Sequence, residues 1–182
     1  MLRIRLPLIV AAVTAVLTVA SATLATAADD KSATEAATRL RGATEPFYDL
    51  ATAQAAGYQI LADAKGITCI DMPEMGAMGV HFVRGDLVGD GDIDPLRPEA
   101  VIYEPQTDGY MQFVGVEYVV LKSDWDAKHS GAPALFGQQF NLIPEGNRYG
   151  LPPFYELHAW IWRHNPRGMF DDWNPRVVCP AA

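Results

Sequence analysis

Residues 110–121, YMQFVGVEYVVL, form a continuous run of β-branched and aromatic side chains. Such residues fit the pleated, half-buried surface of a sheet, and the run contains no proline. Together with EAVIYE at residues 99–104 and the turn residues PQTDG between them, it predicts a β-hairpin. An isolated hairpin is at best marginally stable in water, so the rest of the chain must supply further strands and a covering layer.

Three further segments alternate with a period of two and are predicted as strands. They are ITCID at residues 67–71, MGVHFV at residues 78–83 and YELHAWIW at residues 155–162. Residues 122–154 carry Gly and Pro throughout and predict a long irregular connection. The strand order along the chain favours a mostly antiparallel sheet, which we expect to curl into a barrel-like shape.

Two helices are predicted ahead of the strands. The first covers residues 34–41 and is expected to stop at Gly42. The second lies within residues 44–57, where Thr44 is placed to cap its start. Its narrow apolar stripe should lie on the sheet and consists of Phe47, Leu50, Ala51 and Ala55. The predicted class is therefore α+β, with N-terminal helices packed on a curled, mostly antiparallel β-sheet.

The chain has two cysteines, Cys69 and Cys179, so one bridge is the only intramolecular disulfide that it can form. The absence of a C-x-x-C spacing argues against redox work by a free thiol pair. A structural bridge would tie the C-terminal tail to the start of the sheet. By the chain-entropy model, such a long loop gives a stabilisation of roughly 4 to 5 kcal/mol, which is an upper figure because strain in the folded state often reduces it.

The N-terminal residues 1–27 have the pattern of a secretory signal peptide. Arg3 and Arg5 precede an apolar run, and small residues lead to the A-x-A pattern Ala25-Thr26-Ala27. An uncleaved membrane anchor is the alternative, but Thr and Ser interrupt the run, whereas a spanning helix needs roughly 20 solidly apolar residues. We expect a secreted or periplasmic protein, with no stable membrane span after cleavage and a single domain over residues 28–182.

The mature chain is strongly acidic. Loss of Arg3 and Arg5 reduces the basic residues from 14 to 12 against 22 acidic ones, so the net charge moves from −8 to −10. A surface of this sign repels nucleic acid and anionic membranes, which we therefore exclude as partners. A small-molecule ligand remains compatible with it, and no feature constrains the oligomeric state.

The last predicted strand, residues 155–162, carries the most informative polar side chains. Alternation places Glu156 and His158 on one face, with side chains that emerge about 6 to 7 Å apart. If the sheet curls, His81 and Glu117 join them in a cluster of imidazole and carboxylate groups. Such a set suits Zn, Mn or Fe(II) and leaves positions open for water or substrate. The same cluster is compatible with catalysis or with metal binding alone.

Two other interpretations of these residues stay open. His158 and Glu117 can be hydrogen-bonded in a partly buried face with Glu156 near its rim. Alternatively, His158 can act as a base that Glu117 orients, without a metal. No G-x-S-x-G, phosphate-binding loop or H-E-x-x-H motif points to a particular reaction.

The aromatic residues suggest a different kind of site. Parity within residues 110–121 places Phe113 on the same face as Glu117. A pocket for a small apolar or aromatic ligand is predicted from four side chains, Phe82, Phe113, Trp160 and Trp162. The alternatives to a metal protein are therefore a non-enzymatic binding module with this pocket and a structural protein of the cell envelope.

Several segments together resemble a group of uncharacterised exported bacterial proteins. The likeness covers most of the mature chain and rests on GAMGVHFV at residues 76–83, YELHAWIWRHNPRGMF at residues 155–170 and WNPRVVC at residues 173–179, along with shorter segments such as RPEAVIYEP. The resemblance implies export from a bacterial cell. It implies no activity, cofactor or binding residue.

Overall fold

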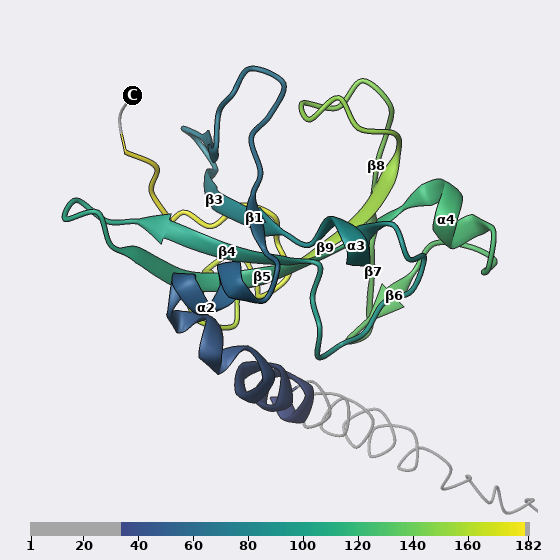
Figure 1. The fold of residues 1–182 in the computed structure, drawn as a ribbon, viewed down its shortest axis with the longest axis horizontal. Helices are drawn as coiled ribbons and strands as arrows, with labels where there is room; N and C mark the ends of the chain where they lie inside the picture. The colour runs from purple at the N-terminus through teal and green to yellow at the C-terminus, as the bar shows by residue number, and fades with distance from the viewer. Residues whose placement is uncertain (1–33, 181–182) are drawn as a thin grey trace, which may run out of the picture.

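The computed structural model describes residues 34–180 (Figure 1). The predicted signal peptide at residues 1–27 lies outside this range. Within the described part of the chain, no helix is long and apolar enough to cross a membrane. The helices at the start of the described chain lie beside an antiparallel sheet, so the predicted α+β class is confirmed.

The N-terminal helical region has different boundaries from the predicted ones. Residues 34–44 are helical, so this helix continues through Gly42. Gly42 does not adopt the left-handed backbone conformation with which a glycine usually ends a helix. The 3-10 helix η1 (Glu45–Tyr48) follows directly, and α2 (Leu50–Ala55) begins after one further residue.

The residue that caps the second helix is also not the predicted one. Asp49 accepts a hydrogen bond from the Ala51 amide at 3.1 Å and so caps α2. Thr44 instead donates its hydroxyl to the Leu40 carbonyl at 2.8 Å. The chain turns at Asp49 because the side chain there satisfies an amide that the new helix leaves unpaired.

The main sheet has the strand order β1-β3-β4-β5-β9-β8, and β2 pairs with the other half of β3. Every pairing is antiparallel. The strands are β1 (Gln59–Ile60), β2 (Cys69–Met72), β3 (Gly76–Val83), β4 (Ala100–Pro105), β5 (Met111–Leu121), β8 (Asn141–Ile143) and β9 (Phe154–Ala159). No pairing among the described residues joins the two ends of this order, so the sheet is open. The predicted barrel-like curl is therefore not found.

The predicted irregular connection at residues 122–154 contains regular structure. It begins with α4 (Lys122–Asp126) and then forms a small separate hairpin from β6 (Ala134–Leu135) and β7 (Gln138–Gln139). It returns to the main sheet as the edge strand β8. These elements are two to five residues long, which is too short for a periodic pattern to be recognised in the sequence.

A β-bulge in β5 decides which of its side chains face the helices. Ile102 pairs with Gly115, but the next residue, Tyr103, pairs with Phe113, so β5 contains one extra residue. The insertion shifts the alternation by one position. Phe113 therefore packs into the helix-covered core, whereas Glu117 lies on the opposite face. The prediction that these two side chains share a face is wrong for this reason.

The face toward the helices carries the main hydrophobic core. The Tyr103 hydroxyl donates to the Phe47 carbonyl at 2.6 Å and ties η1 to the sheet. In the predicted apolar stripe, Ala51 and Ala55 are exposed, and Ala53 is buried in their place. Buried members of this core include Leu40, Tyr58, Val80, Phe82, Val101, Phe113, Val116, Tyr118, Leu157 and Ile161.

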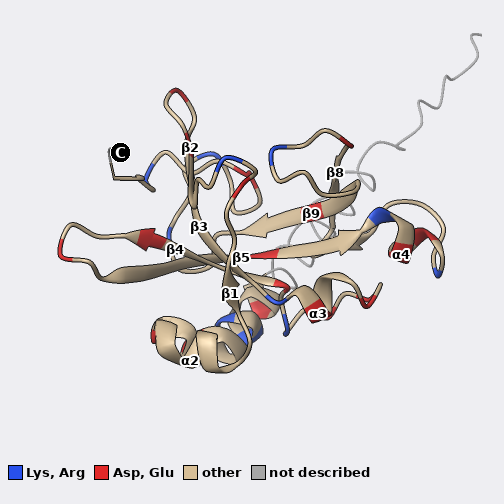
Figure 2. Cartoon of the chain, turned by 45° about the horizontal axis from the view of Figure 1, so that its top comes forward, with Lys and Arg blue, Asp and Glu red and all other residues tan. Residues whose placement is uncertain are grey.

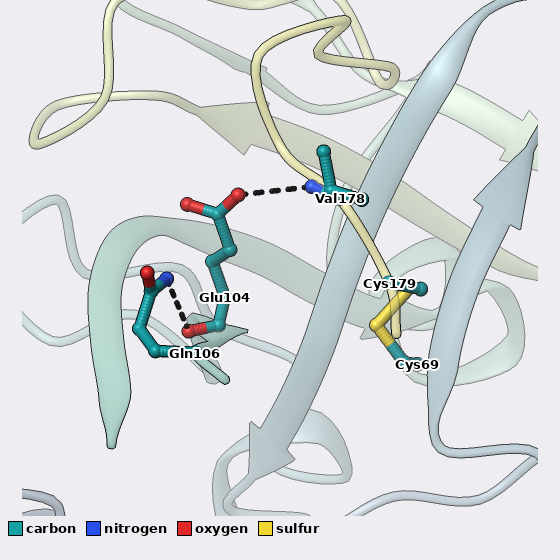
Figure 3. The surroundings of a disulfide bond; sticks show 5 residues. All are labelled: Cys69, Glu104, Gln106, Val178 and Cys179. Carbon is teal, nitrogen blue, oxygen red and sulfur yellow. Dashed lines mark hydrogen bonds between the residues drawn. A yellow bond between two sulfur atoms is a disulfide. The ribbon is translucent and has the colours of Figure 1, made fainter. Parts of the chain in front are cut away.

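The predicted disulfide between Cys69 and Cys179 is confirmed. The two Cα atoms are 5.7 Å apart, and the bridge spans 110 positions of the chain. Beside it, a carboxylate oxygen of Glu104 accepts a hydrogen bond from the Val178 amide at 3.0 Å (Figure 3). The last described residues are thereby attached both to β2 and to β4.

A second attachment holds the tail against the start of β3. The backbones of Ala77 and Asn174 exchange two hydrogen bonds, each of 3.1 Å. Gly76, with a φ of +107°, makes this approach possible, because a Cβ there would lie 2.3 Å from the Asn174 carbonyl oxygen. Farther along, the Trp160 indole donates to the Asp171 carbonyl at 2.6 Å. The C-terminal tail thus covers part of the sheet face that the helices leave free.

Replacing both cysteines, by Cys69→Ser and Cys179→Ser together, should lower the free energy of unfolding by about 2 to 4 kcal/mol and lower Tm. The physical reason is that the unfolded chain regains the entropy that a 110-position loop removes. Denaturant titration of the double variant against the oxidised wild type measures the loss. Equal midpoints would contradict a structural role for the bridge.

Candidate metal centre

Three polar side chains from three strands meet on the sheet face opposite the helices. Glu117 of β5 pairs directly with His158 of β9. His81 of β3 lies on the far side of β4. On β4, Ala100 lies opposite Glu117 and Ile102 lies opposite His81, so the cluster reaches across β4 between these two positions. The cluster therefore joins the neighbouring strands β5 and β9 with β3, which β4 separates from β5.

The nitrogen and oxygen atoms of this cluster have the spacing of ligands around one ion. The Nε2 atoms of His81 and His158 are 3.4 Å apart, and His81 Nε2 is 3.5 Å from a carboxylate oxygen of Glu117. Two nitrogen ligands about 2.1 Å from a tetrahedral zinc ion are roughly 3.4 Å apart. Candidate ligand atoms of all three residues lie within 4.8 Å of one another, and all three residues are buried.

The other ring nitrogen of His158 faces a second group of carboxylates. Its Nδ1 is 3.4 Å from a carboxylate oxygen of Asp172 and 3.9 Å from one of Glu117. Ligand atoms of Glu156, His158 and Asp172 also lie within 4.8 Å of one another. Nδ1 is buried, yet no described residue gives it a well-aligned hydrogen bond. A buried nitrogen in this condition costs about 1 to 3 kcal/mol unless something else satisfies it.

Asp172 is the one member of these groups that the sequence analysis does not identify. It lies in the C-terminal tail, and the side-chain Nδ2 of Asn141 in β8 donates to both of its carboxylate oxygens at 3.2 Å. Tail position alone does not reveal which strand a residue will meet. The available signal is an acidic pair between two aromatic residues, a few positions before the bridged Cys179.

Two buried carboxylates at the candidate site differ from a third one on β4 in having no lysine or arginine partner among the residues that the structure describes. Figure 2 shows acidic positions within β4, β5 and β9. Glu104 of β4 forms an ion pair with Arg163 at 3.1 Å. Among the described residues, neither Glu117 nor Glu156 forms an ion pair with a lysine or arginine, although both are buried. A buried carboxylate is strongly disfavoured unless a cation or a metal accompanies it.

The pKa values of the two histidines are shifted in opposite directions. Burial lowers the pKa of His81 to about 4, against the opposing influence of Glu117, so this imidazole is neutral at pH 7. Burial also acts to lower the pKa of His158, but Glu117, Asp172 and Glu156 outweigh it and raise the pKa to about 9. Burial, reinforced by Glu117, raises the pKa of Glu156 well above its usual range. Without an ion, the cluster therefore holds protons at His158 and Glu156.

The four aromatic side chains predicted to line a ligand pocket do not come together. Phe113 and Trp162 lie in contact on the helix side, with ring centroids 6.0 Å apart. Trp160 lies on the other face, stacked 6.0 Å from the His158 ring. Phe82 packs against Tyr103 in the main core. The two tryptophans separate because β9 ends at Ala159, after which alternation no longer applies.

An open surface hollow of about 580 Å³ borders both Trp160 and Trp162, together with Arg41. Phe82 and Phe113 do not line this hollow. Arg41 lies over the Trp162 ring at 6.0 Å, and its Nε donates to the Ile161 carbonyl at 2.7 Å. This hollow is separate from the imidazole and carboxylate cluster.

The donor set of the cluster suits a divalent ion of the first transition row. Imidazole and carboxylate are common ligands of zinc and iron in proteins, and three protein ligands leave coordination positions free. Asp172 is placed to orient His158 from its other nitrogen, as carboxylates commonly do for metal-bound histidines. No family model, curated protein or solved structure matches the chain.

Metal binding at this cluster should release close to one proton per ion between pH 6 and pH 8. His158, with a pKa of about 9, must lose a proton to offer a nitrogen, whereas His81, with a pKa of about 4, has none to lose. The apparent affinity should therefore rise about tenfold per pH unit over this interval. Calorimetric titration with zinc in buffers of different ionisation enthalpy counts the protons.

The proton count also separates the two ligand groups. Release of about two protons would show that Glu156 also loses its proton when the ion binds, because its pKa also lies above this pH interval. A count near zero would contradict coordination by His158.

Proposed function

We propose that this chain is an exported metal-binding protein that holds one divalent ion of Zn, Mn or Fe between His81, Glu117 and His158. The observation that carries the proposal is the 3.4 Å separation of two buried imidazole Nε2 atoms with a carboxylate 3.5 Å from one of them. Glu156 and Asp172 are assigned to the surroundings of the ion. Asp172 orients His158, and Glu156, whose pKa burial raises well above its usual range, is a carboxyl group beside it that can hold a proton.

Charge balance supports an ion over a purely structural network. In the ion-free alternative, a protonated His158 is the cation that faces Glu117 and Asp172. A divalent ion would compensate the carboxylates with two positive charges. It would also use the nitrogen of His81, which burial keeps neutral and available.

The ligand number favours a site that does more than stabilise the fold. Structural zinc sites are usually closed by four protein ligands, whereas catalytic sites keep an open position for water or substrate. When bound, such an ion supplies a Lewis acid and lowers the pKa of a bound water. In that setting His81 and His158 hold the ion, Glu117 anchors it, and Glu156 is a carboxyl group that can hold a proton nearby.

Export is part of the proposal. The disulfide is compatible with an oxidising compartment, where such bridges persist. The signal-peptide pattern at residues 1–27 and the resemblance to exported bacterial proteins point the same way. A periplasmic or secreted protein would load its metal there or be exported with it.

Protein purified without affinity metals or chelators should contain about one equivalent of Zn, Mn or Fe by elemental analysis. Glu117→Gln, which keeps the side-chain shape, should lower the affinity for added zinc by about 100-fold or more, because it removes a charged ligand. His158→Ala should abolish uptake.

Two controls separate ligand loss from general damage. Glu99→Gln alters another buried glutamate, whose carboxylate accepts the Val119 amide at 3.1 Å, and should leave metal content unchanged. His164→Ala removes an exposed histidine and should behave in the same way. Folded wild type that is metal-free and refuses zinc, manganese and iron on titration would overturn the proposal in favour of a hydrogen-bonded structural cluster.

Asp172→Asn should weaken zinc binding by about 10- to 100-fold without abolishing it. The reason is that loss of a carboxylate behind a metal-bound histidine lowers the basicity of that histidine and loosens its orientation. Competition with a chromogenic chelator measures the affinity. A loss as complete as that of His158→Ala would instead make Asp172 a direct ligand, and an unchanged affinity would remove it from the site.

A further inference from the structure

An apolar pocket of about 380 Å³ adjoins the proposed metal centre on the same face of the sheet. Glu117 belongs to both, since it contributes to the pocket wall and lies 3.5 Å from His81. The volume lies within the range of small-molecule sites in proteins. None of the four aromatic residues predicted from the sequence lines it.

Strand alternation explains why metal ligands and apolar wall share one face. Val83 follows His81 by two positions in β3, and Val119 follows Glu117 by two in β5. Leu121 continues the same row, and β9 contributes Phe154 to the pocket. Because side chains two apart point the same way, the face changes from polar to apolar along its length. The pocket floor is thus a direct continuation of the metal centre.

The opposite wall comes from a loop that is tied down at its base. Arg148 forms an ion pair with Asp63 at 3.0 Å, and its carbonyl accepts the Ala64 amide at 3.0 Å. This contact places Tyr149 and Leu151 at the pocket. The Asp63 carboxylate also accepts hydrogen bonds from the backbone amides of residues 65 and 67, which hold this attachment point of the loop in place. The cavity is therefore bounded by attached segments on both sides.

The polar groups of the pocket are few and unevenly placed. The polar side chains among its lining residues are Gln59, Glu117 and Tyr149. Gln59 is exposed, whereas Glu117 is buried at the metal centre. The rim includes Ile60 and Leu151, which are 55% and 37% exposed although both are apolar. A ligand that fills this space needs an apolar body and gains a polar contact at one end.

We propose that this pocket binds a small apolar molecule whose single oxygen-donor end reaches the metal ion beside Glu117. The apolar body is recognised by the Val83, Val119 and Phe154 floor, and burial of its surface supplies the binding free energy. The assignment of the polar end rests on the proposed metal function, since without an ion Glu117 would repel an anionic oxygen. The ligand class is a short aliphatic or aromatic carboxylic acid or alcohol.

Gly85 offers a way to fill the pocket without disturbing the metal ligands. It lines the pocket, and a Cβ there would meet no atom within 4 Å. Its φ lies outside the left-handed region, so a side chain is tolerated. Gly42 has the same two properties but lies in the N-terminal helix, away from the pocket lining. Gly85→Phe and Gly42→Phe therefore form a matched pair.

The test is calorimetric titration of the full folded chain with octanoate and with 1-octanol, each with and without zinc. Zinc should tighten octanoate binding by about tenfold or more, because the ion reverses the sign of the charge that the carboxylate meets. The effect on the uncharged 1-octanol should be smaller. Gly85→Phe should weaken both ligands by about tenfold or more while keeping its zinc, and Gly42→Phe should bind like the wild type.

The failures of the two proposals are distinguishable. Unchanged octanoate and octanol binding by Gly85→Phe, or no binding by the zinc-loaded wild type, would overturn the pocket. If Gly85→Phe blocks octanoate binding but zinc does not change it, the placement of the oxygen end at the ion would be overturned. A chain that takes up no metal would overturn the proposed function. If that metal-free chain still binds 1-octanol, and Gly85→Phe blocks this binding, the pocket for the apolar body remains supported.

Discussion

The register between β5 and β9 is the constraint on which the rest of this structure depends. Because side chains alternate between the two faces of a strand, a slip of one residue would move every side chain of the strand to the opposite face of the sheet. The bulge near Phe113 sets this alternation for the second half of β5. Without the extra residue, Glu117 would point toward the helices and the apolar core. With it, Glu117 lies opposite His158, on the face that becomes polar.

That second face can be polar because the chain covers it with connections instead of helices. The C-terminal tail, fixed by the disulfide and by the exchange of hydrogen bonds at Asn174, brings Asp172 to His158. The loop fixed by the Arg148 and Asp63 ion pair closes the other end over the apolar pocket. Both covers are attached at their bases, so the groups between them are held in place and largely shielded from water.

Shielding gives the face its chemical character. Burial drives one histidine toward the neutral form, while carboxylates hold a proton on the other. Groups whose pKa values are shifted strongly in opposite directions are common at functional sites, where concentrated charge lowers the stability of the fold. The apolar continuation at Val119 and Phe154 adds a place for a ligand body directly beside this charge. The proposed metal centre would use the polar half of the face, and the proposed ligand pocket would use the apolar half.

The sequence by itself determined the elements with strong local signals. The period-two runs predicted β3, β4, β5 and β9, since alternation and β-branched residues act within a single strand. The cysteine pair determined the bridge, because only one intramolecular partner exists for each thiol. Parity also placed Glu156 and His158 on one face of their strand, where the structure has them beside Asp172.

Only the tertiary structure decided how those elements combine. The helix boundary at Asp49, the short strands within residues 122–154 and the open edge of the sheet arise from contacts between distant segments. The bulge that separates Phe113 from Glu117 leaves no mark in the alternation of a run that is apolar on both faces. Asp172 reaches His158 only because the bridged tail folds back, and a contact of that kind depends on the path of the whole chain.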